Sequence, residues 1–204
     1  MSRRNRANHV AYAVFLRSCG VGAVLAGILF VVWGYIHKPH LPLYFDAGVT
    51  ILSFIVPALF LTGLTGLSVV CKRLRGVLGW TGLFLALCGS TWGVVDGFAD
   101  VGPLYAFFAK LRLPTYLVDW LLPMLTGLTL VGIATVETRT LRSLGALLLT
   151  MGVIGWIYYL TDSGAVLEAR LVHVGSGLVF GLGWVALGFA LWKVGTRQTN
   201  ESDA

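Results

Sequence analysis

The sequence predicts an all-α, polytopic membrane protein folded as a bundle of six transmembrane helices. Six stretches of about 17 to 25 residues contain no Asp, Glu, Lys or Arg, which is the length that a helix needs to cross the hydrocarbon core of a bilayer. Hydrophobic residues make up 57% of the chain and charged residues 12%, with a mean hydropathy of +0.83. The runs are too long for barrel strands and lack their alternation, so helices are the expected spanning elements.

The predicted spans, in chain order, are Ser18–Ile36, Ala47–Cys71, Gly76–Val95, Trp120–Val136, Ser143–Thr161 and Leu171–Trp192. The first helix is expected to begin near Ala13, so residues 1–12 form a cytoplasmic arm, residues 13–193 a single transmembrane domain, and residues 194–204 a cytoplasmic tail. Pro57 lies inside the second span, where a kink is expected. The short links at 72–75 and 137–142 predict that each flanking pair of helices packs as antiparallel neighbours.

The outer loop between the third and fourth helices, at 96–119, is longer than the others. Its centre, at 103–112, is too short to cross a membrane and too apolar to lie in water. At 3.6 residues per turn, Leu104, Phe107, Phe108 and Leu111 fall on one face of a helix. The pattern predicts a short interfacial helix that lies on the outer membrane surface.

An internal repeat is possible between residues 57–97 and 123–164. The sequence Leu-Thr-Gly-Leu-Thr occurs at 61–65 and again at 125–129, after Pro57 and Pro123 respectively. Parallel repeats of this kind occur in transporters whose halves are related by an axis along the membrane normal. Five matching letters in a chain rich in Leu, Thr and Gly can also arise by chance.

The distribution of positive charge predicts the orientation. With the N-terminus inside, all but four of the 15 Lys and Arg residues lie on the cytoplasmic side, the exceptions being Lys38, Lys110, Arg112 and Arg170. The positive-inside rule then places both termini in the cytoplasm and the protein in the plasma (inner) membrane. The basic residues are interpreted as topology signals and as contacts to anionic lipids, so nucleic acid is not an expected partner. The expected partners are the bilayer and either a membrane protein or a second copy of the chain.

Ionisable residues gather at the outer ends of the predicted helices. Asp96, Asp119, Asp162 and His173 are the candidate cavity residues, and His173 is the histidine placed within a span. One interpretation is structural, with carboxylates facing water and His173 bonded to a neighbouring helix. The alternative is an outward-facing polar cavity for a small molecule, a lipid or protons, because intramembrane ionisable groups often mark such pathways. Carboxylates near a histidine would stabilise its charged form and couple a ligand to protons.

A metal-dependent intramembrane hydrolase is a second alternative, with His173, His37 or His40, and an aspartate as metal ligands around an activated water. The sequence contains neither an HExxH motif nor a pair of histidines on one predicted helix, so no motif supports this alternative. A bis-histidine haem would need His173 to face His37, and no cofactor is predicted. The favoured interpretation is a small multi-pass membrane protein that acts as a non-enzymatic structural or accessory module.

Overall fold

A computed structural model describes residues 3–36, 46–71, 76–99, 119–136, 142–161 and 167–203, and within these ranges the protein is helical throughout apart from short turns. The helices are α1 (Arg3–Ile36), α2 (Asp46–Val70), α3 (Val77–Ala99), α6 (Leu121–Val136), α7 (Arg142–Thr161) and α8 (Leu167–Asp203). Five of them are long and apolar enough, by length and composition, to cross a membrane. The predicted all-α class is confirmed.

Helix α6 is the exception among the described helices. It is apolar but has 16 residues, which at 1.5 Å per residue is about 24 Å, less than the roughly 30 Å of a bilayer core. The predicted interfacial helix at 103–112 lies outside the described residues and stays a prediction.

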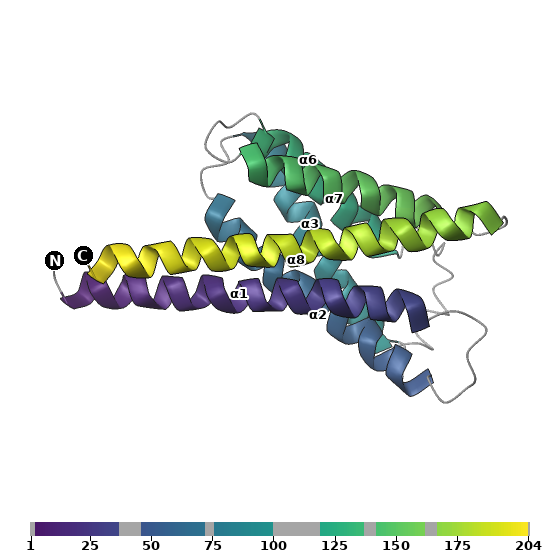
Figure 1. Cartoon of the computed structure of the whole chain (residues 1–204), viewed down its shortest axis with the longest axis horizontal. Helices are drawn as coiled ribbons and strands as arrows, with labels where there is room; N and C mark the ends of the chain where they lie inside the picture. Colours follow the sequence, from purple (N-terminus) through teal and green to yellow (C-terminus); the bar gives the residue numbers. More distant parts are fainter. Residues whose placement is uncertain are drawn as a thin grey trace.

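The two terminal helices are longer than the sequence predicts. Helix α1 begins at Arg3 rather than near Ala13, and α8 continues to Asp203 rather than ending near Trp192. At 34 and 37 residues they are about 51 and 56 Å long, more than a bilayer core requires. They project together beyond the other helices, with both termini at that end (Figure 1). Hydropathy shows where an apolar segment ends, but a helix can continue beyond that point until a helix-breaking residue occurs. Neither Gly nor Pro occurs between Arg3 and Cys19, so α1 extends beyond its apolar part.

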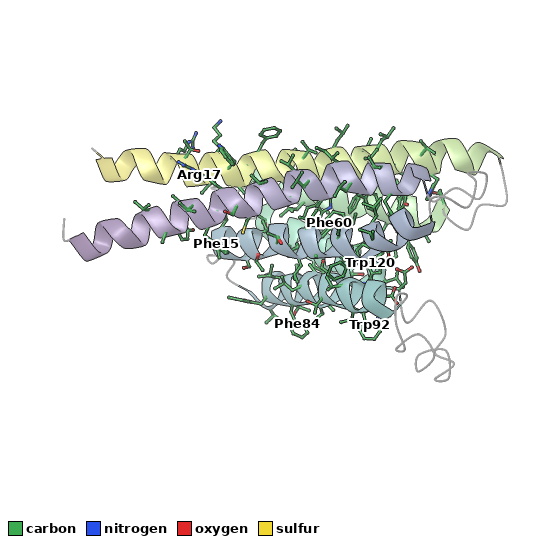
Figure 2. The ribbon with its side chains drawn as sticks, turned by 90° about the horizontal axis from the view of Figure 1, so that it is seen from below. Phe15, Arg17, Phe60, Phe84, Trp92 and Trp120 are labelled. Atoms are coloured by element: carbon green, nitrogen blue, oxygen red, sulfur yellow. The ribbon has the colours of Figure 1, made fainter. Side chains whose placement is uncertain are left out.

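The six described helices form a closed ring. Each of them packs against the next described helix along the chain, and α8 closes the ring by packing against α1. The expected neighbours, α2 with α3 and α6 with α7, are therefore in contact. The interior is filled by an aromatic cluster of Phe30, Phe60, Trp120, Tyr158, Phe180 and Trp184. Figure 2 shows Phe60 and Trp120 between the helices and Phe84 on the outer surface.

The contact between α1 and α8 is made by small residues at three levels. A Cβ placed on Gly20 would lie 2.7 Å from the carbonyl oxygen of Gly188, and one on Gly195 would lie 2.9 Å from that of Ala13. A Cβ on Gly27 would meet the carbonyl oxygen of Gly181. Ala13, Gly20 and Gly27 are seven residues apart, as are Gly181, Gly188 and Gly195. This spacing keeps one face of each helix against the other along an antiparallel seam.

The two segments of the possible repeat pack against different neighbours. Gly63 in α2 lies against Ala23 of α1 and Trp184 of α8, whereas Gly127 in α6 lies against the backbone of Gly82 and Ala86 in α3. The matching letters thus serve close helix packing in both places. Duplication remains a prediction.

Candidate functional site

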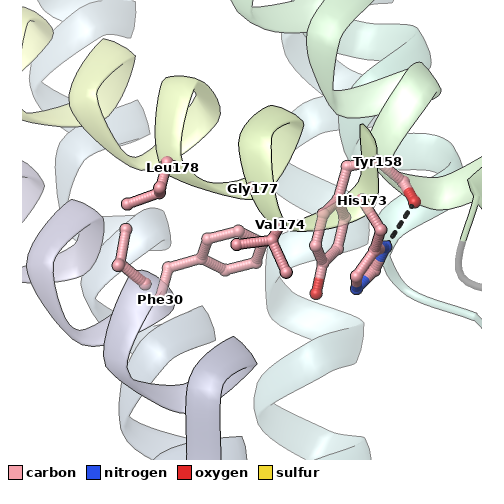
Figure 3. A pocket seen from close by; sticks show the side chains of 7 residues that line it. Phe30, Tyr158, His173, Val174, Gly177 and Leu178 are labelled. Carbon is pink, nitrogen blue, oxygen red and sulfur yellow. Dashed lines mark hydrogen bonds between the residues drawn. The ribbon is translucent and has the colours of Figure 1, made fainter. Parts of the chain in front are cut away.

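A pocket of about 90 Å³ lies between α1, α7 and α8, at the end of the bundle where α1 and α7 end and α8 begins. Its lining residues are Phe30, Val31, Tyr158, His173, Val174, Gly177 and Leu178. Phe30 is 1% exposed and Leu178 is 44% exposed, so the pocket extends from the bundle surface to the aromatic cluster. In Figure 3, Phe30 and Leu178 lie on one side of the pocket and Tyr158 and His173 on the other.

His173 is held by α7. Its Nδ1 lies 3.1 Å from the backbone carbonyl oxygen of Tyr158 and 3.5 Å from Oγ1 of Thr161. A carbonyl oxygen only accepts, so Nδ1 carries the proton and donates to it. The imidazole also stacks on the Tyr158 ring, with centroids 4.2 Å apart and an interplanar angle of 22°.

This hydrogen bond serves the end of a helix. Tyr158 is among the last four residues of α7, whose carbonyl groups have no partner further along the helix. Thr161 Oγ1 also donates to the Tyr158 carbonyl, at 3.0 Å. The geometry assigns His173 a role in joining α8 to the C-terminal end of α7.

Gly177 allows the stacked pair to sit where it does. A Cβ at this position would lie 2.9 Å from Cε2 and 3.1 Å from Cδ2 of the Tyr158 ring. The absence of that Cβ lets the ring lie against the α8 backbone. Tyr158 in turn contacts Phe30 edge to face, with centroids 5.2 Å apart, and so links the pocket to the aromatic cluster.

Asp119 lies at the start of α6. Its Oδ1 accepts a hydrogen bond of 3.0 Å from the backbone N–H of Leu121. An aspartate that accepts from the N–H two residues later is an N-cap, which satisfies one of the open donors of the first turn and places negative charge at the positive end of the helix. The residue is thus used to start α6.

The other candidate residues lie apart from the pocket or outside the described ranges. Asp96 is half-buried near the end of α3, beside Gly97, which approaches the backbone of Ser53 and Phe54 in α2. Neither α3 nor α6 contributes to the pocket wall, so the structure does not bring Asp96 and Asp119 to it with His173. Asp162, His37 and His40 lie outside the described residues, and the described part contains no group of three or more metal-ligating side chains.

Several hydroxyl groups within the helices bond to the backbone of their own helix. Thr62 Oγ1 donates to the Ala58 carbonyl at 2.9 Å, Thr126 Oγ1 to that of Leu122 at 2.8 Å, and Ser176 Oγ to that of His173 at 3.0 Å. In each case the hydroxyl donates to the backbone carbonyl three or four residues earlier in the same helix. These hydroxyls therefore serve the helix that carries them.

Of the residues that line the pocket, His173 is the one that the sequence singles out as a candidate. Tyr158 lies three residues before Thr161, so its backbone carbonyl belongs to the last turn of a helix that ends there. A single sequence does not show that this carbonyl accepts a hydrogen bond from His173. No family model, curated protein or solved structure matches this chain.

Proposed function

We propose that this protein is a six-span integral protein of the plasma (inner) membrane, with both termini in the cytoplasm, that acts as a non-enzymatic structural or accessory module. Five membrane-length helices and the positive-inside distribution support the placement. The shared end of the termini in Figure 1 agrees with an even number of crossings.

Two features support α6 as the sixth span. It packs along α3 on one side and α7 on the other, within the same ring as the five longer helices. Its short length is tolerated where flanking residues reach the interface or the bilayer thins locally, each at modest cost. The amphipathic segment at 103–112 would then lie on the outer surface and lead into α6.

The filled centre of the ring is the observation that favours a structural or accessory role over transport. Phe60 contacts Trp184 in a tilted arrangement with ring centroids 4.3 Å apart, and Phe30 meets Phe180 edge to face at 5.1 Å. These side chains come from α1, α2 and α8 and occupy the axis where a transport path would run. The interior is thus used for packing, and in lipid such packing is what holds helices together.

Reconstitution tests the role against the transport alternative. Purified protein is placed in liposomes that contain a pH-sensitive dye, and proton entry is followed after an imposed pH step. We expect protons to enter these liposomes at the same rate as liposomes without protein. A flux that disappears in His173→Ala would contradict the proposal and favour the proton-coupled pathway.

Cysteine labelling tests the topology separately. Single cysteines at Ser2, Pro103 and Ser163 are treated in intact cells with an impermeant maleimide, with the unsubstituted chain as control because Cys88 is exposed on the bundle surface. We expect labelling at positions 103 and 163 and protection at position 2. Labelling at position 2 with protection at position 163 would reverse the orientation.

A further inference from the structure

We propose that the pocket between α1, α7 and α8 binds a hydrocarbon chain of a phospholipid from the outer leaflet. The inference rests on the proposed membrane placement, which puts this end of the bundle at the outer side. It assigns a ligand class to a pocket whose wall is aliphatic and aromatic except at the His173 end.

The surroundings of the opening determine the occupant. Leu178 lines the pocket and is 44% exposed, and Ile28 and Leu182 on the same two helices are also exposed apolar residues. These residues face the bilayer, where the molecules in reach are acyl chains. Water has too few polar partners in such a site, because a buried water needs two to four. A lipid acyl chain is therefore the molecule that the bilayer makes available to occupy the pocket.

The size of the pocket fits part of a chain. An apolar cavity of about 150 Å³ is enough to bind benzene, so a space of about 90 Å³ accommodates a few methylene groups rather than a whole ring system. Burial of each methylene group contributes about 0.8 kcal/mol when the reference is water, but an acyl chain already lies in hydrocarbon. Selectivity for this position thus comes from van der Waals contact with Phe30 and Val174, not from hydrophobic transfer.

The depth of the pocket favours the outer leaflet. His173 lies three residues after Arg170, the charged residue that precedes the charge-free run of α8, and Phe30 lies six residues before Ile36, where the charge-free run of α1 ends. The pocket is therefore close to the outer boundary of the hydrocarbon region. The stacked Tyr158–His173 pair closes it at one end (Figure 3), so the upper part of a chain would enter past Leu178.

Photo-crosslinking tests the proposal on the full chain in nanodiscs. The probe is a phosphatidylcholine with a diazirine on one acyl chain, present as a minor component of phosphatidylethanolamine and phosphatidylglycerol, and adducts are mapped by peptide mass spectrometry. We expect adducts at Val174 and Leu178 at least threefold above those at Ile28 and Leu182, which are exposed on the same helices outside the pocket.

A matched pair of variants fills the pocket or leaves it open. Val174→Phe adds a ring at the wall, whereas Val172→Phe adds the same ring at a position that is 48% exposed and does not line the pocket. We expect Val174→Phe to remove the enrichment and Val172→Phe to keep it. Circular dichroism confirms that each variant is helical. If Val174→Phe does not fold, Gly177→Ala replaces it, because its Cβ would lie 2.9 Å from the Tyr158 ring and displace that ring at the pocket wall, with Gly175→Ala as its control.

The outcomes separate this proposal from the proposed function. Labelling at Ile28 and Leu182 without enrichment at Val174 and Leu178 would overturn the lipid site and leave the membrane placement intact. Enrichment that Val174→Phe does not change would also overturn it. Absence of labelling at all four positions would contradict the membrane placement itself.

Discussion

Helix α8 packs against two neighbours in two different ways. Toward α1 it presents Gly181, Gly188 and Gly195, which bring backbone against backbone at regular intervals. Toward α7 it presents His173 and Gly177, on which the large Tyr158 side chain lies. The first seam is closed along its length by the smallest residues. The second is built of side chains of unequal size, and the space that they do not fill is the pocket.

The comparison shows how tolerance to change differs along one helix. A carbonyl oxygen that lies against a glycine cannot rotate away, because it belongs to the hydrogen-bonded backbone of the facing helix. A tyrosine ring that lies against a glycine is the far end of a side chain and has room to move. Substitutions of similar size should therefore have unequal effects on the two seams.

The largest effect is expected at Gly27. In Gly27→Ala the new Cβ would meet the carbonyl oxygen of Gly181, so α1 and α8 must move apart. We expect the free energy of unfolding to fall by about 1 to 3 kcal/mol, the usual cost of overpacking. Unfolding in a denaturing detergent, followed by tryptophan fluorescence, measures this loss.

Gly175→Ala is the control for that experiment. A Cβ at Gly175 has no neighbour within 4 Å, so only the helix propensity changes. Alanine is favoured over glycine within a helix by about 0.8 to 1 kcal/mol, so stability should stay equal or rise. Equal losses in Gly27→Ala and Gly175→Ala would contradict the close seam.

A smaller effect is expected at His173. His173→Ala removes the Nδ1 donor from the Tyr158 carbonyl, together with the ring stack. Interhelical hydrogen bonds in membrane proteins contribute on average about 0.6 kcal/mol, so we expect a loss of about 1 kcal/mol in the unfolding assay. Val172→Ala, at the exposed neighbouring position, should change little. A stability unchanged in His173→Ala, with a pH-linked activity lost, would instead favour the polar pathway.

The smallest loss is expected at Gly177. In Gly177→Ala the new Cβ would lie 2.9 Å from the Tyr158 ring, which has to shift by a few tenths of an ångström. The gain in helix propensity offsets part of that cost, and we expect a net change of about 1 kcal/mol or less by thermal unfolding. A loss as large as that of Gly27→Ala would show that the two seams are equally rigid.

Only part of the candidate site could be predicted from the sequence. The charge-free runs and the position of His173 inside one of them are local properties, and the helical class that these runs predict is confirmed for the described residues. The N-cap role of Asp119 also depends on its neighbours in the chain, since the acceptor and the Leu121 N–H are two residues apart. What the sequence left open was which side chains meet across helices.

The sequence by itself determined that the chain is all-helical and rich in membrane-length apolar segments, because a backbone in lipid has to satisfy its own hydrogen bonds within each segment. It also contains the seven-residue spacing of Ala13, Gly20 and Gly27. Only the tertiary structure decided that these residues face Gly195, Gly188 and Gly181, and that Tyr158 lies on Gly177. Glycines in every helix can support a close approach, so the choice of partner depends on how all six surfaces fit together at once.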